Sequence, residues 1–216
     1  MCWNEHVSLN TFLFSSFVLL LIIYNNEYTK YKIQQLNNPY IYIFLASFIS
    51  MQLIEFFIWR NINNKVYNNI FSIFGILLIL IQPVASLMIL KNTQLRNLLI
   101  MIYLFFVIPF SIYKFSTKHI HSVVSKQGHL NWKFFGPNPF TFLFWLFWLF
   151  FLLFVFFYEK IWFGIIFGIV SLLVVVVNFI NDGSAASIWC WVVNIIMIYY
   201  SFYLLIYLPF LEKSHI

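Results

Sequence analysis

The sequence predicts an all-α integral membrane protein, a bundle of seven transmembrane helices. Of its 216 residues, 63% are hydrophobic and only 8% are charged, whereas about a quarter of the residues of a soluble domain are charged. The apolar residues fall into seven runs of roughly the length that crosses ~30 Å of hydrocarbon as a helix. Backbone polar groups in lipid must be satisfied within their own segment, so runs of this length are helices.

The runs form a single transmembrane domain and lie at roughly residues 8–24, 39–59, 70–90, 97–115, 140–158, 161–180 and 185–209. The first follows an N-terminus without the positive residues of a cleavable signal, so we expect it to be retained. Only a few polar residues separate the fifth run from the sixth and the sixth from the seventh, which makes these helices antiparallel neighbours. Residues 116–139 are expected to be the longest extramembrane loop. Six or eight spans are the alternatives.

The second run carries a carboxyl group, Glu55, within a stretch that should lie in lipid. Glu55 lies about six residues past the middle of the run, which places it ~9 Å from the bilayer centre. Gln52 and Trp59 share its helical face, whereas Arg60 is displaced in angle and can reach the headgroups. Ionisable groups at this depth usually face the bundle interior and mark a functional site.

Other polar residues within the runs repeat at helical spacing. They are Ser8, Thr11 and Ser15; Ser72, Gly75, Gln82 and Ser86; and Ser184, Ser187, Trp191, Asn194 and Ser201. Together they predict a polar seam inside the bundle, with Glu55 as its acid at depth. A carboxyl in a low dielectric favours its neutral form, so we expect Glu55 to donate a hydrogen bond to Gln82 or Asn194. A simpler interpretation is that these side chains only hold the helices together.

The fifth and sixth runs indicate helix packing rather than chemistry. Gly164 and Gly168 have the spacing of small residues that lets two membrane helices approach closely. The aromatic fifth run has no polar gap at a helical period. We therefore expect that helix to face lipid around much of its surface.

The loop at 116–139 contains His119, His121 and His129, whose imidazoles could bind zinc. No Cys or acidic residue of the loop supports such a site, and the neighbouring lysines repel cations. We therefore predict no metal and no cofactor, and regard these histidines as weak candidates only.

The basic residues leave the orientation open. Seven spans would place six Lys and Arg residues on each side, whereas the positive-inside rule requires an excess on one. The basic loop at 116–139 favours a cytosolic N-terminus. The net charge of +6 fits contact with lipid headgroups, and no loop has the basic and aromatic surface of a nucleic-acid-binding protein.

The positions of the Lys and His residues relative to the runs exclude several membrane chemistries. No run has an interior Lys for a retinal Schiff base, and all five histidines lie outside the runs. That leaves no axial ligand for intramembrane haem and no intramembrane zinc ligand for a hydrolase. Potassium-filter, GxSxG and Walker sequences are absent. We predict that the protein is not an enzyme; an enzyme acting on lipid would need the loop histidines to fold over the polar seam.

Three segments, SMQLIEFFIWRN, LIQPVASL and GSAASIWCWVVN, resemble motifs of a poorly characterised family of multi-spanning membrane proteins from large DNA viruses and protists. The motifs are Gln-x-x-Glu-aromatic, Gln-Pro, and Gly-Ser followed by Trp-Cys-Trp. The matching residues are Gln52, Glu55, Trp59, Gln82, Pro83, Gly183, Ser184, Trp189, Cys190, Trp191 and Asn194. The resemblance implies a viral protein in host membranes and no particular activity.

Two functional hypotheses arise from the polar seam. In the first, the protein is a small transporter or channel for protons or a small cation. Its site is centred on Glu55, with Gln52, Gln82, Asn194, Ser187 and Trp191 around it. In the second, it is a non-catalytic structural or interaction protein of a large DNA virus, and the seam only packs helices. Transport requires water or substrate to reach Glu55, whereas packing requires a dry carboxyl with complete hydrogen bonds.

Overall fold

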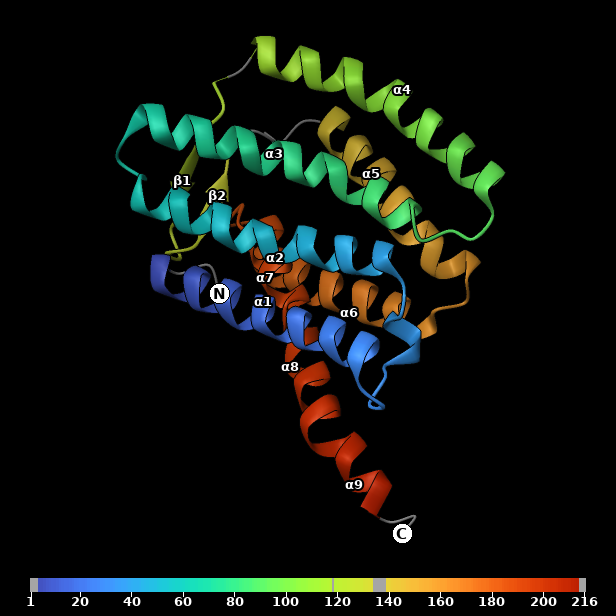
Figure 1. Cartoon of the computed structure of the whole chain (residues 1–216). Coiled ribbons are helices and arrows are strands. Elements are labelled where there is room, and N and C mark those ends of the chain that lie inside the picture. Colours follow the sequence, from blue (N-terminus) through green and yellow to red (C-terminus); the bar gives the residue numbers. More distant parts are fainter. Residues whose placement is uncertain (1–3, 118, 134–138, 214–216) are drawn as a thin grey trace.

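The computed structural model describes residues 4–117, 119–133 and 139–213, and within these ranges the chain is a helical bundle with a single β-hairpin (Figure 1). The helices are α1 (Glu5–Tyr28), α2 (Pro39–Arg60), α3 (Lys65–Leu87), α4 (Thr93–Thr117), α5 (Pro139–Tyr158), α6 (Trp162–Phe179), α7 (Ala185–Val193), α8 (Ile195–Phe202) and α9 (Leu208–Lys213). A 3-10 turn at Gln34–Leu36 precedes α2, and a π-helical segment at Tyr203–Tyr207 joins α8 to α9. The hairpin pairs β1 (Ser122–Val124) with β2 (Leu130–Trp132).

Within the described residues, six helical segments are long and apolar enough to cross a membrane. They are α1, α2, α3, Thr93–Ser116 of α4, α6, and the stretch Ala185–Phe210 that runs through α7, α8 and into α9. Helix α5 is apolar over the shorter stretch Phe142–Tyr158. The protein is therefore a multi-pass membrane protein, and the predicted all-α membrane bundle is confirmed.

Asparagines begin the first three long helices. The side chains of Asn4, Asn38 and Asn64 each accept a hydrogen bond from a backbone N–H in the first turn of α1, α2 and α3. The first N–H groups of a helix have no partner within it, and an Asn cap contributes ~1 kcal/mol by satisfying one. The polar segments between the apolar runs thus set where these helices start.

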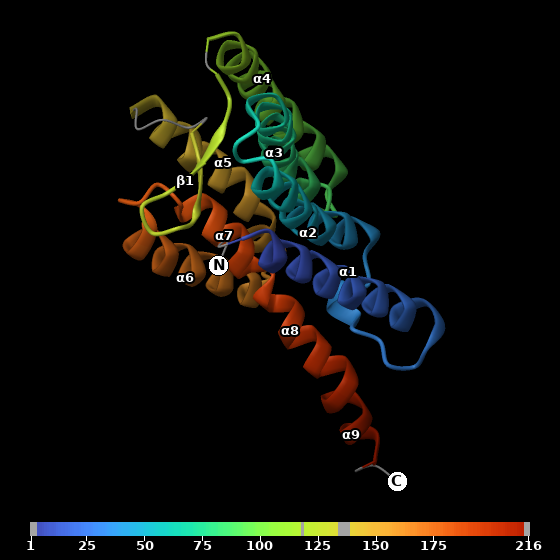
Figure 2. The same ribbon diagram turned by 90° about the vertical axis from the view of Figure 1, so that its left-hand side faces the viewer.

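Two contacts fix how α1 lies antiparallel on α2 (Figure 1). At one end Arg60 Nε lies 3.9 Å from Glu5 Oε2. At the other, Asn26 Nδ2 donates to Tyr42 Oη at 2.8 Å. Helices α7 and α8 cross the bundle obliquely, and the chain leaves it towards the C-terminus (Figure 2).

A proline inside α3 fixes two neighbouring helices against it. Pro83 has no N–H, so the carbonyl of Ile79 lacks its usual helical partner. Trp148 Nε1 of α5 donates to this carbonyl at 2.8 Å. Tyr103 Oη of α4 donates to the next one, Leu80 O, at 2.9 Å. The Trp148 side chain of α5 thus completes the interrupted α3 ladder, and Tyr103 of α4 adds a bond to the adjacent carbonyl.

Helix α5 buries one face although its sequence shows no polar gap. The buried side chains are Phe144, Trp148, Phe151, Leu152 and Val155. On α6, a Cβ added at Gly164 would lie 2.8 Å from Phe156 Cδ1, and one at Gly168 would lie 3.4 Å from Leu153 Cδ2. The two glycines therefore lie where α5 and α6 approach most closely.

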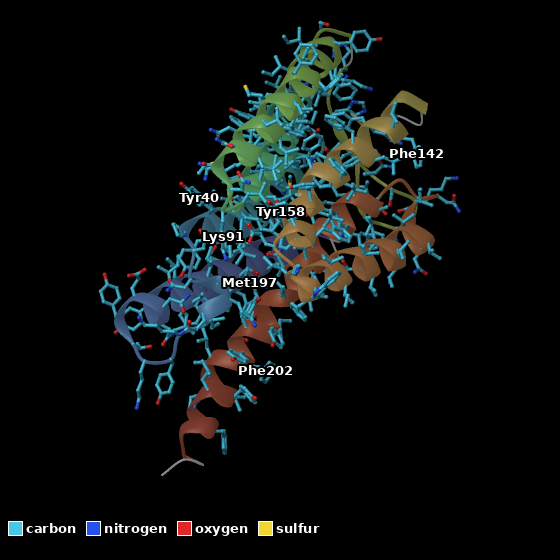
Figure 3. The ribbon with its side chains drawn as sticks, turned by 90° about the vertical axis from the view of Figure 1, so that its right-hand side faces the viewer. Tyr40, Lys91, Phe142, Tyr158, Met197 and Phe202 are labelled. Carbon is cyan, nitrogen blue, oxygen red and sulfur yellow. The ribbon has the colours of Figure 1, made fainter. Side chains whose placement is uncertain are left out.

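At the end of the bundle away from the hairpin, the α3–α4 loop meets the α5–α6 loop. The backbone N–H of Lys91 donates to Glu159 Oε1 at 3.0 Å, and Lys91 Nζ lies 3.9 Å from Oε2. Figure 3 looks onto this part of the molecule, where Tyr40, Lys91 and Tyr158 lie near one another. The α3–α4 and α5–α6 loops therefore contact each other at this end of the bundle.

Candidate functional site

Glu55 lies inside the bundle where α2 meets α7. Its Oε1 accepts a hydrogen bond from Ser187 Oγ at 2.7 Å, and its Oε2 accepts one from Gln52 Nε2 at 3.3 Å. Glu55 and Gln52 are 0% exposed and Ser187 is 1% exposed. The carboxyl is thus sealed from both membrane faces and held by a hydroxyl and an amide.

Local helix geometry supplies both of these partners. Gln52 precedes Glu55 by three residues, so the two side chains are neighbours on α2. Ser187 lies in the first turn of α7, where the free N–H groups give the helix end a partial positive charge. That end of α7 therefore stabilises negative charge on the carboxyl.

Further buried oxygen atoms lie on the helices that adjoin this carboxyl. The α1–α2 register set by the Glu5–Arg60 and Asn26–Tyr42 contacts puts Ser15 level with Gln52. Trp191 Nε1 donates to Thr11 Oγ1 at 3.0 Å, which brings α7 onto the same part of α1. Asn194 follows Trp191 by about one turn and Ser187 by seven residues, so it lies about 10 Å beyond Ser187 along the helix.

We call Ser15, Gln52, Glu55, Ser187 and Asn194 the Glu55 group. Three of its atoms, Ser15 Oγ, Gln52 Oε1 and Asn194 Oδ1, are buried without a hydrogen-bond partner among the described residues. A buried polar atom in this condition costs about 1–3 kcal/mol, and in native proteins it calls for a specific explanation such as a bound water or ion. The group therefore has acceptor capacity beyond what its own hydrogen bonds use.

The expected bonds from Glu55 to Gln82 or Asn194 do not form. The Gln82 amide has no hydrogen-bond partner in the described part of the chain, and Asn194 Nδ2 donates to Cys190 O of its own helix at 2.8 Å. A Cβ at Gly75 would meet Ile54 at 3.6 Å, and Gln82 lies seven residues, about 10 Å, further along α3. Helical spacing places Gln82 on the right face of α3 but at the wrong depth.

Cys190 lies beside the Glu55 group, a position that the sequence did not predict. It follows Ser187 by three residues on α7, is buried, and lies within electrostatic reach of Glu55. Its helical spacing from Ser187 could have indicated that it shares a face with that residue. The thiol provides a native chemical probe beside the carboxyl.

The β-hairpin packs against α3 through β1 and against α7 through β2 (Figure 2). Ser122 of β1 lies opposite Trp132 of β2. Ile120, Leu130 and Trp132 belong to the main hydrophobic core. The segment expected to be an extramembrane loop therefore inserts a buried hairpin between helices.

Asparagines and serines of α3 clamp β1. Asn68 Nδ2 donates to Ser122 O at 2.9 Å, and Asn68 Oδ1 accepts from Ser122 N at 2.8 Å. Ser72 Oγ lies 2.8 Å from Ser122 Oγ, and Asn69 Nδ2 donates to Ile120 O at 2.6 Å. These polar contacts join residues 50 or more apart in sequence.

Asp182, in the loop between α6 and α7, holds the other strand and the hairpin turn. Its Oδ1 accepts from Gln127 N at 3.3 Å and its Oδ2 accepts from Ser184 Oγ at 2.8 Å. Asn131 Nδ2 donates to Asp182 O at 3.1 Å. The hairpin is thus tied to the bundle on two sides.

The predicted zinc candidates do not come together. His119 and His121 are exposed, whereas His129 is buried with its ring edge-on to Phe179 at 5.3 Å between centroids. Among the residues that the structure describes, no three His, Cys, Asp or Glu side chains are placed to share a metal ion. His129 instead lies on the side of the hairpin that Asp182 contacts.

Burial lowers the pKa of His129 below its ordinary 6.5, although the charge of Asp182 acts in the opposite direction. The pKa of Asp182 is also lowered. Desolvation acts to raise it, but the hydrogen bonds from Ser125, Ser184 and Gln127 outweigh that effect. Both groups thus favour their deprotonated forms in the folded protein.

We expect acid to destabilise the docked hairpin. Because both pKa values are lower in the folded than in the unfolded state, the stability that they contribute is present above about pH 6.5. It is lost as the pH falls through the lowered pKa of His129 and then that of Asp182. Melting temperatures in detergent at pH 7.5, 5.5 and 4.5 measure this loss, and His129→Gln should flatten the first part of the curve. An unchanged curve in that variant would contradict the assignment.

The Glu55 group offers carboxylate, amide and hydroxyl oxygens from α1, α2, α7 and the start of α8. Such hard oxygen ligands suit protons and alkali or alkaline-earth cations rather than thiophilic metals. A single carboxyl supplies one negative charge, which matches a proton or a monovalent cation. No family model, curated protein or solved structure matches this chain, so function has to be inferred from this chemistry.

Proposed function

We propose that this protein carries protons or a small monovalent cation across the membrane, with Glu55 as the binding group. The observation that supports this is a fully buried carboxyl with an unused acceptor oxygen on the adjacent Gln52, and with further unused buried oxygens on Ser15 of α1 and Asn194 after α7. Ionisable residues inside membrane helices are costly and usually line ion or proton pathways. Helix packing alone would not need the additional acceptors.

The burial of Glu55 favours a carrier over a channel. A channel needs a continuous aqueous path, whereas a carrier passes through a form in which its site is closed to both faces. Gln52, Glu55 and Ser187 are at most 1% exposed. This arrangement fits the occluded form of a carrier.

A second candidate is a structural role in which Glu55 ties α2 to α7. Both carboxyl oxygens have hydrogen-bond donors, Ser187 and Gln52, which a packing role also requires. Interhelical hydrogen bonds of this kind contribute ~0.6–2 kcal/mol each. This candidate predicts no transport at all.

Flux measurements in liposomes separate the two candidates. We expect Glu55→Gln to reduce proton or cation flux at least tenfold, because the amide keeps the shape of the side chain but neither titrates nor carries charge. Flux is followed with a pH-sensitive dye and, separately, with a sodium-sensitive dye trapped inside the vesicles.

Glu27→Gln is the matched control, because it removes an exposed carboxyl at the far end of α1. It should transport like the wild type. Absence of flux in the wild type, or equal flux in the Glu55→Gln variant at equal stability, would favour the structural role.

A further inference from the structure

We infer that the route to the Glu55 group begins at the hairpin end of the bundle, is lined by Asn68, Ser72 and Ser184, and is closed by the β1–β2 hairpin acting as a movable plug. This inference rests on the proposed function and adds to it an entrance and a gate. Three observations support it: the depth that the hairpin reaches, the buried polar side chains around it, and the few contacts that hold it in place.

The hairpin reaches the depth of Glu55 from the α3 side. Gly75 packs against Met51 and Ile54 of α2, so Ser72, about one turn earlier on α3, lies level with Glu55. Ser72 Oγ is 2.8 Å from Ser122 Oγ of β1. The opposite strand, β2, packs against α7, which carries Ser187 (Figure 1). The hairpin therefore fills the space between α3 and α7 beside the carboxyl.

Beside the apolar contacts of Ile120, Leu130 and Trp132 with the core, the hairpin also packs against buried polar side chains. Asn68 and Ser72 on α3 and Ser184 before α7 are all buried, and each is hydrogen-bonded to the hairpin or to the Asp182 that holds it. Burying such groups in a permanent seal brings little stability, because their hydrogen bonds only replace those to water. Once the hairpin withdraws, the same side chains would bind water along a path to Glu55.

The hairpin is also held in a way that permits release. A two-stranded hairpin is marginally stable by itself, and each of its strands has only three residues. Apart from the core contacts of Ile120, Leu130 and Trp132, its position is set by Asn68, which binds both backbone groups of Ser122, and by Asp182, which binds Gln127 and Asn131. Loss of either clamp should shift the hairpin towards an undocked form.

Modification of Cys190 measures access to the site directly. With Cys2 replaced by Ser, Cys190 is the only thiol, and it is buried beside Glu55. We expect Asn68→Ala to speed its reaction with a charged, membrane-impermeant methanethiosulfonate at least tenfold. Asn178→Ala is the matched control, since Asn178 is exposed and, among the described residues, bonds within its own helix to Val174 O at 2.7 Å. Equal rates in the wild type and the Asn68→Ala variant would overturn the assigned entrance.

A reversible lock tests the gate. In a chain with Cys2→Ser and Cys190→Ala, Ser72→Cys and Ser122→Cys place two thiols where hydroxyls now lie 2.8 Å apart. We expect oxidation to reduce flux at least tenfold and a reductant to restore it, with neither single cysteine variant responding. Full flux in the oxidised protein would overturn the gate and leave the proposed function intact. Absence of flux in the wild type would overturn the proposed function, while the rate of Cys190 modification would still decide whether the hairpin covers the site.

Discussion

Replacing Trp148 with Ala is expected to lower the free energy of unfolding by about 3–5 kcal/mol, the range for deleting a buried aromatic side chain. Trp148 is 2% exposed in the main core. Its indole N–H also donates to the carbonyl of Ile79, which Pro83 deprives of a helical partner. The substitution therefore creates a cavity and an unpaired carbonyl at the same point.

Reversible unfolding in mixed detergent micelles measures this effect, and Trp148→Phe separates its two causes. The phenyl ring retains much of the packing but donates no hydrogen bond, so it should cost about 1–3 kcal/mol. In a Pro83→Ala background the helical N–H returns to Ile79, and Trp148→Phe should then cost less. Trp162→Ala is the control, because that side chain is 59% exposed on α6. Equal costs of Trp148→Phe in both backgrounds would show that the indole does not complete the α3 ladder.

The helices could be predicted because lipid leaves an apolar run of this length few alternatives. Each predicted run coincides with a helical segment, but the bounds differ: most helices extend beyond their run, whereas α3 ends at Leu87 within the run 70–90 and α6 is shorter than the run 161–180. The first run, 8–24, corresponds to Glu5–Tyr28. The additional turns are polar, and they form because Asn4 caps the start and Thr29 bonds back to Asn25 O at the end. Hydropathy does not register such contributions.

The hairpin could not be predicted in the same way. Residues 119–133 lack the alternating apolar pattern that marks a strand. What holds the segment is tertiary, namely the bonds from Asn68 to Ser122 and from Asp182 to Gln127, each joining residues more than 50 apart. Local sequence carries no sign of these partners.

The sequence predicted which helix faces carry the site residues, but not how deep in the bundle each of them lies. Helical spacing put Gln52 beside Glu55, and the stripe on the last run contained Ser187, which the structure brings from 132 residues away. The same spacing also suggested Gln82, but the α2–α3 register places it nearer the other end of the bundle. How far two antiparallel helices slide along each other depends on their packing, which single-helix periodicity does not describe.

The resemblance to membrane proteins of large DNA viruses and protists stays a prediction, as does a location in host membranes. Of the residues that carry it, Gln52, Glu55, Cys190 and Asn194 are in or beside the Glu55 group. The motifs therefore coincide with the site whose chemistry the flux experiments test.

Replacing Gly183 with Ala is expected to cost about 3 kcal/mol and to undock the hairpin. Gly183 has a φ of 74°, in the left-handed region where a side chain is strained by about 1 kcal/mol or more. A Cβ there would overlap the amide nitrogen of Asn131 and lie 3.0 Å from its Cγ. Relieving that overlap would move Asn131 away from Asp182 O, to which it donates at 3.1 Å.

Gly128→Ala separates strain from overlap. Gly128 also has a positive φ, 80°, but a Cβ there would meet no atom within 4 Å, so this variant should show only the cost of backbone strain. The unfolding experiment in mixed micelles should therefore find Gly183→Ala about 2 kcal/mol less stable than Gly128→Ala. Adding Asn131→Ala removes the overlapping amide, so the double variant should lose less stability than the sum of the two single ones. Additive losses would mean that Gly183 does not act through Asn131. Cys190 should also react faster in Gly183→Ala than in Gly128→Ala, because displacing Asn131 loosens the hairpin on the side where Asp182 holds it.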